Sequence, residues 1–189
     1  VIRITEDIDA TSVEGIYLAA KGCLSKKSLL FASIPCTGRS SFTHINKHIP
    51  SACKKIRGHV KAMIELLHVL EALCHIAVDS GCLICIEWPT GCVYWRRRDV
   101  KALISRYNLV GVKFHGCALG LTGVSGGPMF KPWKFMTNCP NIIKSFETIR
   151  CDRRHQHEIV AGANTKSSEG YTVDFVPKHH DAFSEAVES

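Results

Sequence analysis

LLFASIPCTGRSSF, residues 29–42, is the stretch that decides the fold of this chain. Its first half is a short apolar run, which is typical of a strand buried in a parallel sheet. Pro35 ends the run because proline cannot donate to a strand ladder, and Cys36 follows at once in a polar loop. Ligands of open α/β sheets bind beyond the carboxyl ends of the strands. We therefore expect Cys36 either to face a ligand or to be a half-buried structural cysteine, which is the commoner case.

A second apolar run, CLICIE (82–87), predicts a neighbouring buried strand that ends in a carboxylate. Glu87 in that position is costly unless it has a partner or a chemical task. Two neighbouring strands would offer Cys36 and Glu87 at the same edge of the sheet. Further strands are predicted near residues 1–5, 109–115 and 131–137. Helices are predicted from Thr11 or Ser12 to about Lys21, from Ala52 to about Asp79, and over residues 99–107. These elements predict a three-layer α/β domain with a mostly parallel sheet.

Composition indicates an ordinary globular chain: 189 residues, 46% hydrophobic, enough for one domain with a substantial core. No apolar run approaches the ~20 residues that span a bilayer, and no signal-peptide pattern is present, so no membrane partner is expected. The ten cysteines predict free thiols in a reducing, intracellular compartment, nuclear or cytoplasmic. The net charge of +7 favours an anionic partner such as nucleic acid. The abrupt start at Val1 suggests a fragment.

Ile34-Pro35-Cys36, followed by small polar residues, resembles the Pro-Cys nucleophile loop of the cytosine-C5 DNA methyltransferases. Glu87-Trp88-Pro89 is similar to that family's Glu-Asn-Val strand end. The resemblance covers about residues 1–138 and implies a Rossmann-like sheet, S-adenosylmethionine as methyl donor and DNA as partner. The family's early glycine-rich loop is missing, so the N-terminal cofactor-binding strands would be lacking. The same pair of motifs resembles segments of mobile-element or viral polyproteins.

The resemblance also implies roles for single residues. Cys36 would attack C6 of a flipped cytosine, and Glu87 would bind and protonate the ring nitrogen N3. Arg39 is the nearest cation in sequence that could lower the pKa of the thiol. The residues expected at the cofactor are Pro35 and an acidic residue, Asp7 or Asp9, although acidic residues before a helix are common without any ligand.

Aromatic and basic residues after Pro89 form a candidate nucleic-acid surface. In TGCVYWRRR (90–98), ring faces beside guanidinium groups could stack bases and hold phosphates, or the rings could instead anchor the loop by packing. Lys131 or Lys134 would have to replace the arginine with which the family touches the target base, since no Gln-x-Arg-x-Arg pattern is present. The predicted nucleic-acid-binding residues are Tyr94, Trp95, Arg96, Arg97, Arg98 and Lys131.

Residues 139–189 are expected to form a C-terminal extension packed on the domain of residues 1–138. This extension contains ligands suited to a tetrahedral zinc ion, although their spacing is not that of a standard finger and the resembled family needs no metal there. The predicted metal ligands are Cys139, Cys151, His155 and His157.

The sequence therefore favours a DNA (cytosine-5) methyltransferase-like function that uses the Cys36 thiolate. The alternative is a catalytically inactive nucleic-acid-binding domain on the same scaffold, from a mobile-element or viral protein. A third hypothesis is a thiol enzyme in which His44 or His115 serves Cys36 as base.

Overall fold

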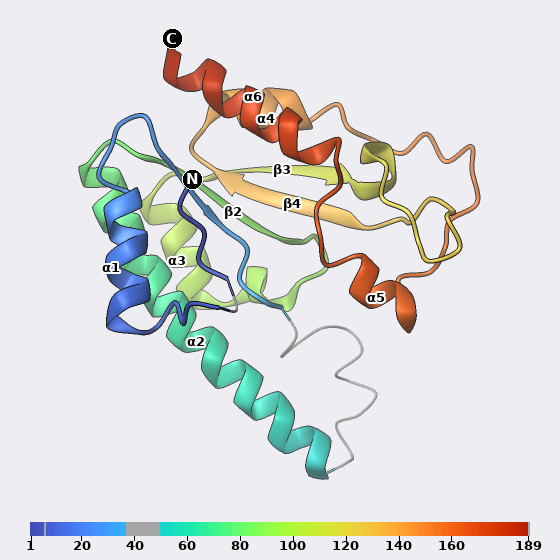
Figure 1. The fold of residues 1–189 in the computed structure, drawn as a ribbon, viewed down its shortest axis with the longest axis horizontal. Helices are drawn as coiled ribbons and strands as arrows, with labels where there is room; N and C mark the ends of the chain where they lie inside the picture. Colours follow the sequence, from blue (N-terminus) through green and yellow to red (C-terminus); the bar gives the residue numbers. More distant parts are fainter. Residues whose placement is uncertain (6, 37–49, 189) are drawn as a thin grey trace.

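A four-stranded sheet lies at the centre of the computed structural model, which describes residues 1–5, 7–36 and 50–188 (Figure 1). The strands are β1 (Leu29–Ala32), β2 (Leu83–Pro89), β3 (Val110–His115) and β4 (Pro132–Thr137), arranged in the order β1-β2-β4-β3. The α/β class is confirmed. The sheet is mixed, however, because β1 and β2 are parallel while β4 runs antiparallel to both of its neighbours.

The antiparallel direction of β4 follows from the connection before it. A parallel pair needs a crossover, usually a helix, whereas the chain between β3 and β4 folds back on itself. Its two ends are tied by a backbone hydrogen bond from Gly116 N to Lys131 O of 2.9 Å. Four of the five predicted strands are present. Residues 1–5 are not a strand: Val1 and Ile2 are exposed and the segment has no regular structure.

The predicted helices are confirmed. α1 (Val13–Gly22) begins after Ser12, one of the two predicted caps, whose hydroxyl accepts a hydrogen bond from Gly15 N. The remaining elements are α2 (Pro50–Asp79), the 3₁₀ turn η3 (Val93–Arg96), α3 (Arg98–Arg106), the 3₁₀ turn η4 (Gly116–Leu119), α4 (Pro140–Phe146), α5 (Ala163–Ser167) and α6 (Phe175–Glu188).

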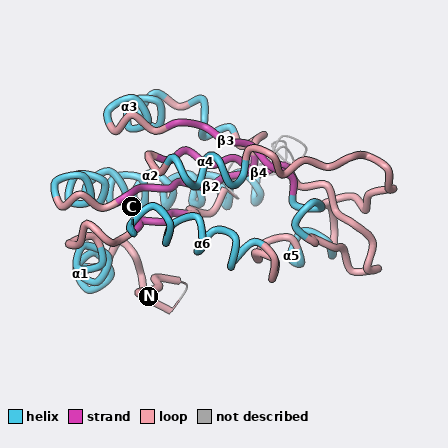
Figure 2. The backbone as a smooth tube through the Cα atoms, turned by 90° about the horizontal axis from the view of Figure 1, so that it is seen from above, coloured by secondary structure: helices cyan, strands magenta, loops and turns pink. Residues whose placement is uncertain are grey.

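Two hydrophobic clusters cover the two faces of the sheet, so the molecule has three layers. Side chains of a strand alternate between faces, and in β2 Ile84, Ile86 and Trp88 join the cluster formed with α2 and α3, while Cys85 joins the cluster formed with α4 and α6. Residues after 139 thus supply part of the core. α1 and α3 lie beside one end of the long helix α2, which runs diagonally past the sheet (Figure 1), whereas α5 and the long connections lie at the opposite end of the molecule from α1 (Figure 2).

No helix among the described residues is both long and apolar enough to cross a membrane. The cysteines of the described ranges form no disulfide with one another.

Candidate functional site

Cys36 and Glu87 come together because β1 and β2 are parallel neighbours. The register pairs Ala32 with Ile86, so the next residue, Ser33, lies beside Glu87 and its hydroxyl donates to Glu87 Oε2 at 2.8 Å. The indole Nε1 of Trp88 donates to Ile34 O at 2.6 Å and ties the two strand ends together. Cys36 follows on the same segment, close enough for the charge of Glu87 to affect its pKa.

Glu87 is buried, with 4% of its surface exposed. Its Oε2 accepts hydrogen bonds from Ser33 and from the hydroxyl of Tyr171, the latter at 2.7 Å. Its Oε1 is buried and has no hydrogen-bond partner among the described residues. Burial raises the pKa of Glu87, and the two hydrogen bonds and the charge of Lys131 offset this only in part. The site therefore holds a carboxyl group that keeps its proton to a higher pH than an ordinary glutamate and has one oxygen available.

Cys36 is partly buried, and its pKa is lowered to about 7. The largest cause is a hydrogen bond from the Cys92 thiol, and the positive charge of Lys131 adds to it; burial and Glu87 act in the opposite direction. Cys92 is buried and its own pKa is raised by the same hydrogen bond, so it keeps its proton and remains the donor. Arg39, expected to activate the thiol, lies outside the described residues.

Lys131 reaches this site from the entry of β4. The antiparallel register pairs Pro89 with Trp133, so the start of β4 lies beside the end of β2. Burial lowers the pKa of Lys131, and the charges of Glu87 and Cys36 act against that shift. Its Nζ donates to Ser168 O and lies 5.5 Å from the centre of the Trp133 ring. Cys36, Glu87, Cys92, Lys131 and Tyr171 are called the thiol–acid site below.

Two predicted base-stacking residues lie in the core instead. Tyr94 is fully buried and Trp95 nearly so, and both rings pack edge-on against Trp88. A ring enclosed on both faces cannot stack on a base, so the packing interpretation is the correct one for them. Of the three arginines, Arg97 pairs with Asp99 through Nε and Oδ1 at 3.0 Å, and Arg96 and Arg98 are exposed.

The residues expected at a methyl donor do not form a cradle for it. The Asp9 carboxylate accepts hydrogen bonds from the backbone N and hydroxyl of Thr11, at 2.8 and 2.7 Å, and these lower its pKa. This is the local geometry of a turn before a helix. Asp7 and Pro35 are exposed. The structure of these three residues thus gives no support to S-adenosylmethionine binding.

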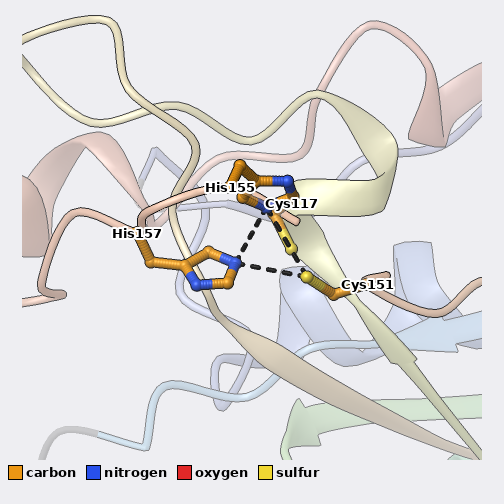
Figure 3. Close-up of side chains that lie close together, drawn as sticks. All are labelled: Cys117, Cys151, His155 and His157. Atoms are coloured by element: carbon orange, nitrogen blue, oxygen red, sulfur yellow. Dashed lines mark hydrogen bonds between the residues drawn. The ribbon is translucent and has the colours of Figure 1, made fainter. Parts of the chain in front are cut away.

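A second group of chemically active side chains lies beyond the C-terminal end of β3, which pairs with the entry of β4. Cys117, Cys151, His155 and His157 point toward one another, and their ligand atoms all lie within 4.8 Å of one another (Figure 3). This group could hold a metal ion. The predicted set was wrong at one position: Cys139 is fully buried in the core before α4, and Cys117 of η4 takes its place.

His115 belongs to the surroundings of this group, not to the thiol–acid site. Its Nδ1 accepts a hydrogen bond from Cys151 N at 2.9 Å, and its ring packs on Phe130 at 4.8 Å. Burial and the nearby Arg150 and Arg153 lower its pKa. The third hypothesis thus loses His115 as a base for Cys36, and His44 lies outside the described residues.

Sequence reasoning missed Cys92, Tyr171 and Cys117. Cys92 had a local signal, since it follows Glu87-Trp88-Pro89 after a turn. Tyr171 and Cys117 had none, because they approach their partners only through the path of the folded chain.

Comparisons with protein-family models, with curated proteins and with solved structures gave no match for this chain.

Proposed function

We propose that this chain activates a pyrimidine base by covalent addition of the Cys36 thiolate, as the cytosine-C5 DNA methyltransferases that its motifs resemble would do. One observation carries the proposal: two neighbouring groups have opposite pKa shifts. The pKa of the Cys36 thiol is lowered to about 7, and the pKa of the Glu87 carboxyl is raised by burial. Each group is thereby biased toward the form that the reaction needs, a nucleophilic thiolate and a proton-donating acid.

The chemistry follows from the poor reactivity of cytosine C5. The Cys36 sulfur forms a bond to C6, the ring electrons move to N3, and Glu87 places its proton there. Glu87 Oε1 is the atom suited to this task, because Oε2 already accepts two hydrogen bonds. The resulting enamine can attack an electrophile through C5. Loss of the C5 proton then expels the thiolate, and Glu87 recovers its proton from N3.

The proposal also includes a methyl donor and a larger sheet than the four strands described. The resemblance implies S-adenosylmethionine, and β1–β4 would be the half of a Rossmann-like sheet that carries nucleophile and acid; doubly wound folds do include antiparallel strands. Asp7, Asp9 and Pro35 do not fit a donor site, so we assign no described residue to the donor and derive no step through it.

DNA is the partner that we propose. A base in a duplex must be extruded before a thiol can reach C6, at a cost of about a few kcal/mol. Contacts to phosphates can offset that cost. Arg96 and Arg98 are exposed and follow Cys92 by only a few residues, which places cations near the thiol–acid site along the chain.

Exchange of the cytosine C5 hydrogen with solvent tests the proposal without a methyl donor. Reversible addition of a thiolate to C6 makes C5 exchangeable, so oligonucleotides incubated with the protein in D₂O should gain deuterium at C5. Cys36→Ser should abolish the exchange and Glu87→Gln should slow it at least tenfold, whereas Cys53→Ser, a change on α2, should leave it intact. Absence of exchange with both single- and double-stranded DNA would overturn the proposal.

The binding-only alternative is favoured by the net charge of +7 and by the exposed arginines. It predicts salt-dependent DNA binding that Cys36→Ser does not change, with no C5 exchange. Measuring DNA binding and C5 exchange on the same wild-type and Cys36→Ser samples therefore distinguishes the covalent function from binding alone.

A further inference from the structure

We propose that Cys117, Cys151, His155 and His157 form a structural zinc site. Two thiolates and two imidazoles are a common ligand set for tetrahedral zinc, and four protein ligands close the coordination sphere. Three ligands come from one short loop and the fourth comes from η4, at the end of β3 (Figure 3). The inference is independent of the proposed function.

The distances among the ligand atoms of Cys151, His155 and His157 are close to those that a zinc ion imposes. With Zn–S of about 2.3 Å and Zn–N of about 2.05 Å, a tetrahedron separates sulfur from nitrogen by about 3.6 Å and the two nitrogens by about 3.3 Å. Cys151 Sγ lies 3.5 Å from His155 Nε2 and 3.3 Å from His157 Nε2. The two Nε2 atoms are 2.9 Å apart, so a bound ion requires them to separate by only a few tenths of an ångström.

The surroundings of the ligands also suit a metal. The backbone N–H of Arg153 donates to Cys151 Sγ at 3.3 Å, which stabilises a thiolate. Arg153 has φ of 59°, so the chain after this N–H takes a left-handed turn. The Asp152 carboxylate lies 3.6 Å from Nδ1 of His155, the nitrogen that does not face the group. A zinc-bound histidine usually donates its second ring nitrogen to a carboxylate, a carbonyl or water, and the Asp152 carboxylate lies beside that nitrogen here.

The position of the site indicates what the ion holds together. The Phe130 ring contacts the rings of His115 and His157, with centroids 4.8 and 5.2 Å away, and the Arg153 guanidinium lies 5.4 Å from its centre. Lys131 follows Phe130 directly, and its carbonyl accepts the hydrogen bond from Gly116 N. The ion would therefore join the end of β3 to the 151–157 loop around the entry of β4, which carries Lys131 to the thiol–acid site.

Metal content of the purified chain tests the site. We expect one zinc ion per chain in wild type, loss of most of it in Cys117→Ser, and full retention in Cys139→Ser. The two variants separate the ligand set of the folded structure from the set that the sequence suggested. A zinc-free wild type that also fails to bind added zinc overturns the proposal, as does a folded Cys117→Ser variant that keeps its zinc.

Two measurements do not depend on removing a ligand. Wild type reconstituted with Co²⁺ should show the visible absorption of a tetrahedral ion and a thiolate charge-transfer band. Asp152→Asn removes the negative charge beside His155 but keeps the oxygen that accepts from Arg154 N, and it should weaken zinc binding by about 10- to 100-fold. An octahedral Co²⁺ spectrum, or unchanged zinc affinity in Asp152→Asn, would contradict the assigned geometry.

Discussion

The pKa of Cys36 is the quantity on which the thiol–acid site depends, and replacing its hydrogen-bond donor should change it. At pH 7 a thiol with a pKa of about 7 is half ionised, whereas one with the ordinary value of 9.0 is about 1% ionised, a difference of about fiftyfold. Lowering the pKa by about two units also reduces intrinsic nucleophilicity, by about six- to tenfold at a Brønsted coefficient of about 0.4–0.5. Cys36 should therefore react with iodoacetamide about five- to eightfold faster at pH 7 than an ordinary accessible thiol.

The assay is the labelling rate of the Cys36 peptide, followed by mass spectrometry over a pH series that brackets 7 and 9. In wild type the rate should level off above a midpoint near 7. Cys92→Ala removes the donor and should move that midpoint toward 9. Cys92→Ser keeps a hydroxyl donor in the same place and is the matched control, so its midpoint should stay close to that of wild type.

Two results would refute this reasoning: a wild-type midpoint near 9, or a folded Cys92→Ala variant with an unchanged midpoint. The labelling midpoint of Cys36 in Glu87→Gln tests the protonation state of Glu87. The proposed acid role requires Glu87 to be protonated at the pH where Cys36 ionises, and in that case the neutral amide should leave the midpoint of Cys36 nearly unchanged. A clear decrease would mean that the carboxylate is ionised and cannot act as the acid.

Stability measurements test the remaining buried groups. Because the pKa of Glu87 in the folded protein is raised above 4.5, its contribution to the free energy of unfolding is complete below pH 4.5 and is lost as pH rises through the folded-state pKa. The Tm of Glu87→Gln should therefore increase relative to that of wild type as pH rises, and a difference in Tm that does not change with pH would contradict this. Tyr171→Phe removes a hydrogen bond to Glu87 and should cost about 1 kcal/mol in urea unfolding; a cost near zero would mean that this bond contributes nothing. Burial lowers the pKa of His179 from 6.5 to about 4. The neutral ring therefore contributes fully to the free energy of unfolding above pH 6.5, and about 3 kcal/mol of that free energy is lost as pH falls toward 4. His179→Leu should remove that acid sensitivity while His180→Gln, at an exposed neighbour, should keep it; equal acid melting of the two variants would exclude His179 as its source. Phe114→Ala deletes a fully buried ring and should cost about 3–5 kcal/mol in urea unfolding, whereas a loss below about 1 kcal/mol would show that the core refills the space.

Local patterns in the sequence were enough to predict most elements of the fold and part of each site. The apolar runs that precede Pro35 and Glu87 predict β1 and β2. A strand buried on both faces is continuously apolar, and this pattern can be recognised without knowing which residues pack against it. Cys36 and Glu87 could be expected together because parallel neighbours end at the same edge. Cys151, His155 and His157 of the metal group could also be predicted, because they lie close together in sequence on one short loop.

Only the tertiary structure decided the partners that arrive from elsewhere in the chain. The turn after β3 reverses the direction of β4 and thereby brings Lys131 beside Glu87 and Cys36. The same path puts Cys117, not Cys139, next to the loop cysteine and histidines. Burial of Tyr94 depends likewise on a packed layer of helices that no local pattern specifies. Residue type and short spacing state which chemistry is possible, but which groups meet depends on chain reversals and packing summed over the whole molecule.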